Sequence, residues 1–270
     1  MHIDSSAETG VQHGQAAPAI ALFLFAHQDD EFAVFQQITS ERQGGRRVVC
    51  MYFTSGVPAG GDPACRNAES VSVLSALGVA PGDIYFPGEL LAIPDGTLQE
   101  HIAVAAAWLA SETAAWQPLA SIYLMAWEGG HPDHDVLHAI GMQVFGARGL
   151  AAVMRQFALY NGHRCPGQFF RVLSPLAANG PVESTRMNWP QRLHFLRLCL
   201  QYPSQRITWI GLFPFVLLHY LFNGKQALQM VSAERVLQRP HTGALYYEKR
   251  GFSTWKTVNS RLAQWRAGLE

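Results

Sequence analysis

Short, wholly apolar runs alternate along this chain with longer stretches that suit helices. Residues 19 to 26 (AIALFLFA) form one apolar run of strand length, and residues 47 to 54 (RVVCMYFT) form the next. A strand buried on both faces of a sheet has this pattern. Residues 30 to 43 between them are helix-compatible and end at Gly44 and Gly45. Together they predict a strand, a helix and a second strand parallel to the first.

The same alternation continues to about residue 160. Helices are expected over residues 64 to 77, 97 to 115 and 133 to 145, and strands over residues 83 to 86, 120 to 126 and 156 to 160. This order predicts an α/β fold, with a mostly parallel sheet and helices on both faces. Beyond residue 165 the pattern is irregular and rich in proline, with two apolar helical stretches and a polar tail. We therefore expect one domain over residues 1 to 270, with a core at 19 to 165 and a C-terminal extension at 166 to 270.

One segment of the extension, Ile207 to Phe222 (ITWIGLFPFVLLHYLF), carries no charge. A bilayer-spanning helix needs about 20 apolar residues, and Pro214 and His219 interrupt this shorter run. A buried or interface helix is the favoured interpretation. Contact with a membrane surface is the alternative, and a contact between copies in a homo-oligomer also fits.

The charge balance argues against partners held by a strong electrostatic field. The chain has twenty Lys and Arg residues and twenty Asp and Glu residues, so its formal net charge is zero. It therefore lacks the excess of basic residues that indicates binding to nucleic acid. The four cysteines show no CxxC spacing, which fits a reducing compartment. Residues 1 to 18 lack the basic start of a signal peptide. A cytoplasmic location is expected, with membrane association as the alternative.

Polar chemistry is concentrated just after two of the predicted strands. The sequence AHQDDE (26 to 31) follows the first strand, and WEGGHPDHD (127 to 135) follows the fourth. In open α/β sheets, ligands bind beyond the carboxyl ends of the strands, which share one edge. Acids and histidines about 100 residues apart should therefore meet in one crevice. Tyr160, His163 and Arg164 follow the fifth strand, where a substrate could also reach them.

These residue types suit a catalytic metal site. Such a zinc site takes three protein ligands and leaves a position open for water, and His27, Asp30 and His134 would supply that set. Asp29 would be the general base that accepts the proton of the water. His131, when protonated, would stabilise the oxyanion and then protonate the leaving amine. Zn²⁺ is the expected ion, and another divalent metal such as Fe²⁺ fits the same ligands.

The two motifs resemble those of the PIG-L or LmbE-like deacetylase family, whose usual first motif is AHPDDE. Arg66 and Glu69 resemble that family's RxxE pair, and IPDGTL around Asp95 resembles its PDG element near the sugar site. The resemblance is clear over residues 19 to 160. It implies a Rossmann-like fold and zinc-dependent removal of N-acetyl groups, often from N-acetylglucosamine-containing molecules. It also implies the ligands and base named above, with Arg66 and Asp95 as candidate substrate contacts.

The chain departs from the family pattern at two places. Gln28 stands where the family has proline, and we expect it to relax the loop without removing chemistry. Gly129 and Gly130 lie before HPDH, where some relatives place a tyrosine as oxyanion donor, so Trp127 or a backbone amide becomes a candidate donor. His138 lies four residues after His134, and packing is favoured over a metal role for it.

The expected reaction is hydrolysis of the N-acetyl group of an acetamido sugar or glycoconjugate, including lipid-linked ones. Two alternatives remain open at the level of sequence. A non-haem iron oxygenase also uses two His and one carboxylate, and His131 to Asp133 form an HxD triplet. A sugar-binding protein with a vestigial metal site would carry the same motifs without turnover.

Overall fold

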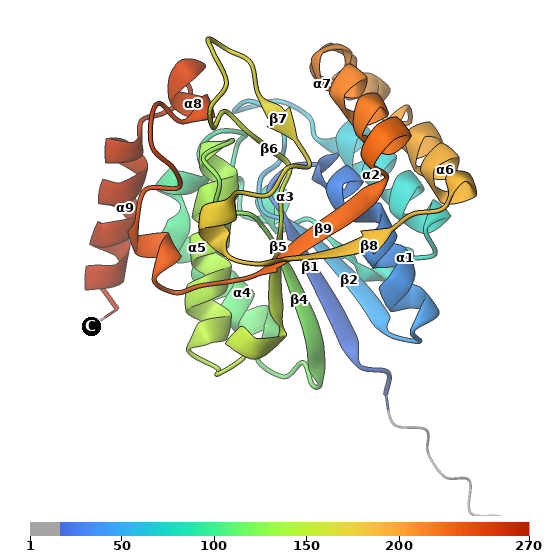
Figure 1. Cartoon of the computed structure of the whole chain (residues 1–270). Coiled ribbons are helices and arrows are strands. Elements are labelled where there is room, and N and C mark those ends of the chain that lie inside the picture. Colours follow the sequence, from blue (N-terminus) through green and yellow to red (C-terminus); the bar gives the residue numbers. More distant parts are fainter. Residues whose placement is uncertain (1–16, 270) are drawn as a thin grey trace, which may run out of the picture.

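A seven-stranded sheet runs through the computed structural model, which describes residues 17 to 269 (Figure 1). The strand order is β3-β2-β1-β4-β5-β9-β8. The five strands on one side are parallel: β1 (Ile20–Phe25), β2 (Arg47–Tyr52), β3 (Ile84–Tyr85), β4 (Leu119–Met125) and β5 (Met154–Phe157). The other two, β8 (Val182–Arg186) and β9 (Lys225–Met230), are antiparallel. The predicted α/β class and mostly parallel sheet are confirmed.

Strand β1 lies at the centre of the molecule. It pairs with β2 on one side and β4 on the other, so Phe23 has Cys50 and Tyr123 as its neighbours. All six residues of β1 are buried, which explains why its sequence is apolar without alternation. The strand that precedes the first motif is therefore fixed between two others.

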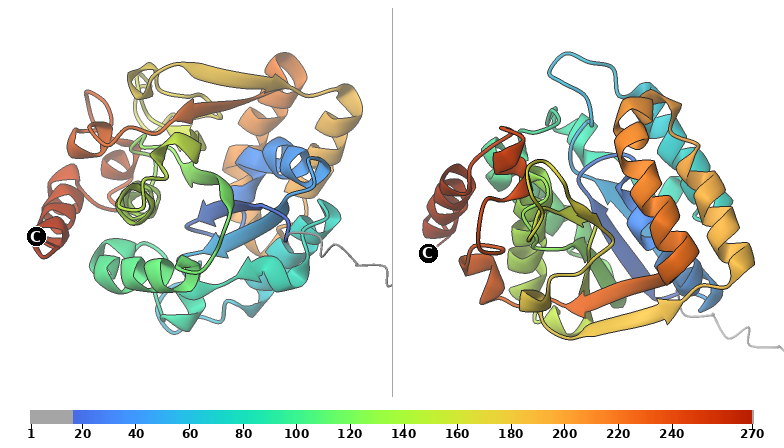
Figure 2. Two further views of the ribbon diagram at one scale, coloured as in Figure 1. Left: turned by 90° about the horizontal axis from the view of Figure 1, so that it is seen from below. Right: turned by 45° about the horizontal axis from the view of Figure 1, so that its top comes forward.

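Helices cover both faces of the sheet, as Figures 1 and 2 show. One face carries α1 (Phe35–Gln43), α2 (Ala64–Ala76), α6 (Trp189–Cys199) and α7 (Arg206–Leu218). The other carries α4 (Ile102–Thr113) and α5 (Pro132–Gly146), with α9 (Trp255–Ala267) packed outside them. Two single-turn helices complete the set, α3 (Pro87–Leu90) and α8 (Tyr246–Lys249).

Several predicted boundaries are wrong, for local reasons. The stretch over residues 30 to 43 opens with a 3₁₀ turn, Asp30–Val34, before α1 begins. The helix expected from residue 97 is divided: a 3₁₀ turn, Leu98–Glu100, comes first, and α4 starts only at Ile102. The Asp133 carboxylate accepts the amide of Leu98 at the start of that turn. Similarly, the strand expected over residues 156 to 160 ends at Phe157.

The next residues leave the sheet and form a separate hairpin. Strand β6 (Tyr160–Asn161) pairs with β7 (Arg171–Val172) instead of extending β5. The carboxylate of Glu128 accepts the amides of Leu159 and Tyr160, at 2.7 and 3.1 Å, so these amides are unavailable to a neighbouring strand. The hairpin then rises beyond the carboxyl ends of the strands (Figure 1).

The segment after residue 165 is more regular than its sequence indicates. Strands β8 and β9 extend the central sheet, and Gln229 of β9 pairs with Gln156 of β5. Neither strand has a strong apolar signal, because every residue of β8 is exposed at the sheet's edge and β9 reads KQALQM. The division into core and irregular extension was therefore wrong for the sheet itself.

The uncharged run from Ile207 to Phe222 forms α7 and a π-helical turn, His219–Asn223. One side of it packs inward through Trp209 and Val216. The other side is open, and Ile207 and Phe222 are each 82% exposed. Within residues 17 to 269, no helix is both long enough and apolar enough to cross a membrane.

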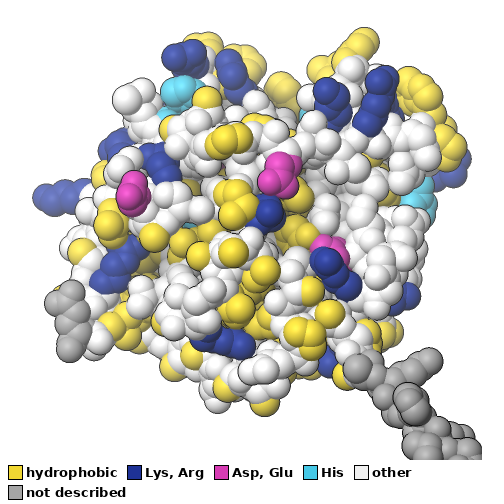
Figure 3. Space-filling view, turned by 60° about the horizontal axis from the view of Figure 1, so that its bottom comes forward, with side chains coloured by type: hydrophobic (Ala, Val, Ile, Leu, Met, Phe, Trp, Pro, Cys, Tyr) yellow, Lys and Arg dark blue, Asp and Glu magenta, His cyan; other side chains and the backbone are white. Residues whose placement is uncertain are grey.

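Basic side chains are spread over the face shown in Figure 3. Uncharged and hydrophobic surface separates the Lys and Arg residues seen there, and acidic side chains lie among them. On the described residues of this face, positive charge therefore forms no continuous stripe.

Candidate active site

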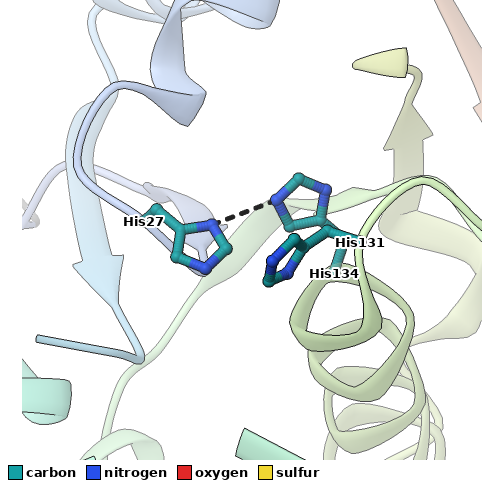
Figure 4. A group of neighbouring side chains, drawn as sticks. All are labelled: His27, His131 and His134. Carbon is teal, nitrogen blue, oxygen red and sulfur yellow. Dashed lines mark hydrogen bonds between the residues drawn. The ribbon is translucent and has the colours of Figure 1, made fainter. Parts of the chain in front are cut away.

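The two sequence motifs meet where β1 and β4 end. The chain leaves β1 toward β2, while β4 pairs on the opposite side of β1, so the crevice between them is a topological switch point. His27 lies just beyond β1, and His131 and His134 lie at the start of α5, after β4. Figure 4 shows the imidazole of His27 facing the two histidines of α5.

Three side chains bring donor atoms to the distances expected around one metal ion. His27 Nδ1 lies 3.2 Å from His134 Nε2. The carboxylate of Asp30 lies 3.4 Å from His27 Nδ1 and 3.3 Å from His134 Nε2. Ligands held about 2.0 to 2.1 Å from a tetrahedral zinc ion are roughly 3.3 Å apart. The set of two imidazoles and one carboxylate therefore fits zinc in both chemistry and spacing.

The Asp30 carboxylate is fixed before any ion binds. Its Oδ2 accepts the amides of Ala26 and His27, at 3.1 and 2.7 Å. Burial by itself would raise the pKa of this carboxyl, but His134 and His27 outweigh that effect and hold the pKa far below its ordinary value. Asp30 is thus an ionised, oriented oxygen donor.

Asp133 is a site residue whose position the sequence reasoning missed. Its side chain is fully buried, accepts the amides of Gly96 and Leu98 at 2.7 and 3.0 Å, and lies 3.2 Å from His27 Nε2. A carboxylate on the far nitrogen of a metal-binding histidine orients the ring and fixes its tautomer. The signal is the HPDH motif, in which Asp133 directly precedes the ligand His134, whereas the sequence interpretation above uses Asp133 only for the iron alternative.

Asp95 also approaches His27. Its Oδ1 lies 3.1 Å from His27 Nε2, and its side chain is 38% exposed. Donor atoms of His27, Asp95, His131 and Asp133 lie within 4.8 Å of one another, and so do those of His27, His131 and His134. Because the Nδ1 atom of His27 faces Asp30 and His134, its Nε2 is left for Asp95 and Asp133. The donor atoms of His27, Asp30 and His134 lie 3.2 to 3.4 Å apart on the Nδ1 side of His27.

Asp29 is turned away from its neighbour Asp30. Its backbone is left-handed, with φ of 110°, and its amide donates to Glu31 Oε2 at 2.9 Å. The carboxylate lies 3.6 Å from Arg66 and lines a pocket of about 200 Å³ in front of the triad. Burial raises the pKa of Asp29 to about 8, and the charge of Arg66 opposes that rise.

Gln28 anchors the loop instead of relaxing it, so the expectation for this position was wrong. Its side chain is 1% exposed and donates to Asn67 at 2.6 Å, while its carbonyl accepts Arg66 at 2.7 Å. Arg66 also donates to the carbonyl of Gly56. A Cβ at Gly56 would come within 2.0 Å of Gln28 Oε1, so the amide side chain needs glycine beneath it. Through these hydrogen bonds, Arg66 fixes the loop that carries Gln28 and Asp29.

His131 occupies the opposite wall of the pocket. It caps helix α5, with its Nδ1 accepting the amide of Asp133 at 3.3 Å. Burial, followed by the charge of His27, lowers the pKa of His131 to about 4.

Six further residues complete this pocket, which we call the site pocket. They are Phe32, Tyr160, Gln205, Thr208, Leu212 and Phe252. The ring of Tyr160 lies 5.5 Å from that of His134. Burial raises the pKa of the Tyr160 hydroxyl well above its ordinary value, so it remains a hydrogen-bond donor.

Several candidates from the sequence lie outside the site pocket, among them Trp127, His138, His163 and Arg164. Trp127 is fully buried and its indole N–H donates to the carbonyl of Gln238, so it cannot be the oxyanion donor. His138 bonds to the carbonyl of Met125 at 2.7 Å, and burial lowers its pKa to about 4. The packing role favoured for His138 agrees with these contacts.

Comparison with known proteins gives one family match. Residues 22 to 145 match the family model described as PIG-L: GlcNAc-PI de-N-acetylase. A search of curated proteins finds no match. Among solved structures, a deacetylase triple mutant from the teicoplanin biosynthetic pathway has a TM-score of 0.61 at 16% identity, covering 79% of this chain and 98% of that one.

Two further solved structures have the same fold. The A40926 pseudoaglycone deacetylase has a TM-score of 0.60 at 16% identity, covering 84% of this chain and 100% of that one. The N,N′-diacetylchitobiose deacetylase from Pyrococcus horikoshii has a TM-score of 0.55 at 15% identity, covering 83% and 88%. At these identities the likeness shows the fold. The family match covers both motifs, and residues 22 to 145 therefore carry a PIG-L family domain, as the motifs predicted.

Proposed function

We propose that this chain is a metal-dependent hydrolase that removes the N-acetyl group of an acetamido sugar or an N-acetylglucosamine-containing glycoconjugate. The observation that carries the proposal is the triad of His27, Asp30 and His134, spaced 3.2 to 3.4 Å apart at the back of a pocket that Asp29 and His131 line. The description of the matching family and the deacetylase folds of the solved structures support it.

His27, Asp30 and His134 would hold the ion, and Zn²⁺ is the proposed one. Two imidazoles and a carboxylate also accept Fe²⁺, so the native metal is part of the proposal. One solved structure with this fold is the zinc-inhibited form of teicoplanin deacetylase. When bound, such an ion polarises the amide carbonyl and lowers the pKa of water to about 7.

Asp29 and His131 divide the proton transfers. The Asp29 carboxylate accepts the proton of the attacking water, and Arg66 at 3.6 Å favours its ionised form. Negative charge then develops on the carbonyl oxygen, which the hydroxyl of Tyr160 and a protonated His131 would stabilise. His131 gives its proton to the nitrogen as the C–N bond breaks, which leaves acetate and a free amine.

The rim of the pocket suits a sugar ring. Asp95 is partly exposed beside His27 and can accept hydrogen bonds from sugar hydroxyls. Arg66 reaches the same pocket, although its guanidinium already binds two carbonyls. We propose Asp95 as a direct substrate contact, and Arg66 chiefly as support for Asp29.

Helix α7 makes a lipid-linked substrate part of the proposal. Thr208 and Leu212 line the site pocket, while Ile207 and Ile210 of the same helix are 82% and 74% exposed. An apolar helix surface beside the pocket could rest on a membrane and take its substrate there. A second copy of the chain is the competing partner for this surface.

A single domain over residues 1 to 270 and a cytoplasmic location stay predictions.

A substrate panel tests the function. Purified protein with bound metal is assayed for acetate released from N-acetylated sugars and glycoconjugates, with the chelated protein as control. Release that depends on metal supports the hydrolase. Sugar binding without any release would favour the vestigial-site alternative, and oxygen consumption with Fe²⁺ would favour the oxygenase.

A further inference from the structure

A second cavity, of about 480 Å³, lies on the other side of the β6–β7 hairpin from the metal site. Tyr160 of β6 lines the site pocket and the next residue, Asn161, lines this cavity, so β6 forms the wall between them. The opposite wall includes residues 235 to 242, which connect β9 to α8 (Figure 1). Its basic side chains are Arg164, Arg171, Arg235, Arg239, His163 and His241. We call this cavity the arginine pocket.

The positive charge of the arginine pocket is poorly balanced. The chain as a whole is neutral, and its basic side chains are scattered on the face in Figure 3, yet four arginines converge here. No aspartate or glutamate is among the described residues that line the pocket. Like charges gathered around a concave surface raise the local potential and attract anions.

Two of the arginines are held in place by the fold. Arg235 donates to the side chains of Asn179 and Gln238 and to the carbonyl of Pro240, at 3.2, 2.9 and 2.6 Å, and all three acceptors are neutral. Its charge is therefore positioned but not cancelled. Arg239 forms an ion pair with Glu248, which cancels one charge of the four.

The other two arginines remain available. Within residues 17 to 269, neither Arg164 nor Arg171 forms an ion pair or a side-chain hydrogen bond, and both are exposed. Arg164 has a left-handed backbone, with φ of 57°, which is uncommon for a residue other than glycine. Both come from the β6–β7 hairpin, opposite the fixed Arg235.

Two histidines lie between the walls with ring nitrogens that lack partners. The rings of His163 and His241 are 4.9 Å apart, and His241 is only 7% exposed. His241 Nε2 and His163 Nδ1 are buried without a hydrogen bond. Buried polar atoms without partners are rare, and here they occur in a positively charged cavity. A ligand that brings oxygen atoms would give them partners.

We propose that the arginine pocket binds a phosphorylated ligand, of the phosphate or pyrophosphate class. A guanidinium presents a planar fork of N–H donors that matches phosphate oxygens, and several arginines around one group give charge and geometry together. The volume lies within the ordinary range for small-ligand sites, about 300 to 1,000 Å³. The phosphate group could be free or could be part of a larger substrate whose acetamido sugar occupies the site pocket.

Calorimetric titration of the metal-loaded protein with inorganic pyrophosphate at low salt tests the binding. Arg171→Ala should weaken it about tenfold, since a hydrogen bond to a charged group contributes roughly 1.5 to 3 kcal/mol and each 1.4 kcal/mol is tenfold. Arg164→Gly is the second variant, because glycine adopts a positive φ at no cost. Arg197→Ala, an exposed arginine on α6, is the matched control and should bind like wild type.

The titration is repeated after chelation, because pyrophosphate can also bind a metal ion. Binding that survives chelation and weakens in both arginine variants supports the proposal. Binding that disappears on chelation, or that equals wild type in both variants, overturns it.

Kinetics distinguish the two sources of phosphate. If the substrate carries the phosphate, Arg171→Ala should raise KM about tenfold for a phosphorylated N-acetylated sugar and leave an unphosphorylated one unchanged. If the ligand is free, the variant should change neither KM, while pyrophosphate binding still weakens.

Discussion

At the residue scale, the proposed site depends on two neighbouring carboxylates with different roles, Asp30 as a metal ligand and Asp29 as the general base. Asp29 and Asp30 are adjacent, yet the left-handed backbone of Asp29 separates the directions of their carboxylates. Asp30 is held by two amides and two histidines, whereas Asp29 lies in the pocket beside Arg66. Opposite pKa shifts follow, upward for Asp29 and downward for Asp30, because burial dominates one and cationic neighbours the other.

Replacement of the proposed base tests that division of tasks. Asp29→Asn should retain the metal and lose about a hundredfold or more in kcat, since an amide cannot accept the proton of water. Metal content by atomic absorption and acetate release at saturating substrate are the measurements. Wild-type kcat in this variant would assign the base to another group, and Glu31→Gln is then the variant to assay.

Substitutions at the metal site should lower metal affinity by two different amounts, a large one when a ligand is lost and a smaller one when only its orientation is disturbed. His27→Ala, Asp30→Ala and His134→Ala each remove a donor atom and should lose most of the bound metal. Asp133→Asn keeps the ligands but weakens the orientation of one ring, so about tenfold weaker binding is expected. Competition with a chelating dye measures both, with His194→Ala on the surface of α6 as control. Full occupancy in all three alanine variants would refute the ligand assignment.

At the element scale, the exposed face of α7 is the feature with the least obvious partner. Its buried side chains fix it against the body of the protein, and its outer apolar side chains continue from the rim of the site pocket. Aliphatic and aromatic side chains exposed together indicate a contact surface more often than chance exposure. We therefore propose this surface as the place where a membrane or a second copy would bind.

A double substitution on α7 and the π-helical turn that follows it distinguishes a membrane from a second copy. Ile210→Glu with Phe222→Glu should abolish co-sedimentation with anionic liposomes and leave thermal stability near wild type, because both side chains are exposed, at 74% and 82%. Leu237→Glu, at another exposed apolar position, is the control. Wild-type protein that never sediments with liposomes would exclude the membrane. Dimers that dissociate in the double variant would instead identify a second copy.

At the scale of the whole molecule, buried carboxyls make stability depend on pH. Glu128 accepts bonds from Leu159, Tyr160 and Asn161, and burial raises its pKa to about 7. Between pH 4.5 and 7 the folded protein keeps this proton and the unfolded chain does not. Stability from Glu128 is thus lost as pH rises through that window.

Glu128→Gln removes this dependence. Between pH 4.5 and 8 the unfolding free energy of wild type should fall by about 3 kcal/mol relative to the variant, because each pKa unit corresponds to about 1.4 kcal/mol. Urea unfolding across that range measures it. The variant is expected to be less stable at low pH, since an amide cannot accept all three bonds, and the difference in slope is the test. Parallel slopes would show that Glu128 is ionised in the folded protein.

The sequence alone determined the features that rest on local pattern. Apolar runs of strand length and glycine-terminated helices predicted the parallel half of the sheet, because burial on both faces excludes polar residues from such strands. Two motifs at the ends of β1 and β4 predicted that His27, Asp30 and His134 would meet, because parallel strands end at one edge.

Only the tertiary structure decided what depends on contacts between distant segments. Strands β8 and β9 join the sheet through hydrogen bonds of their backbones. At an exposed edge the side chains need not be apolar, so their pattern predicts such a strand poorly. The contact of Asp133 with His27, the lowered pKa of His131 and the packing of Gln28 over Gly56 each depend on burial and on partners far along the chain. The arginine pocket likewise depends on tertiary structure, because its four arginines come from two segments that are far apart in the sequence.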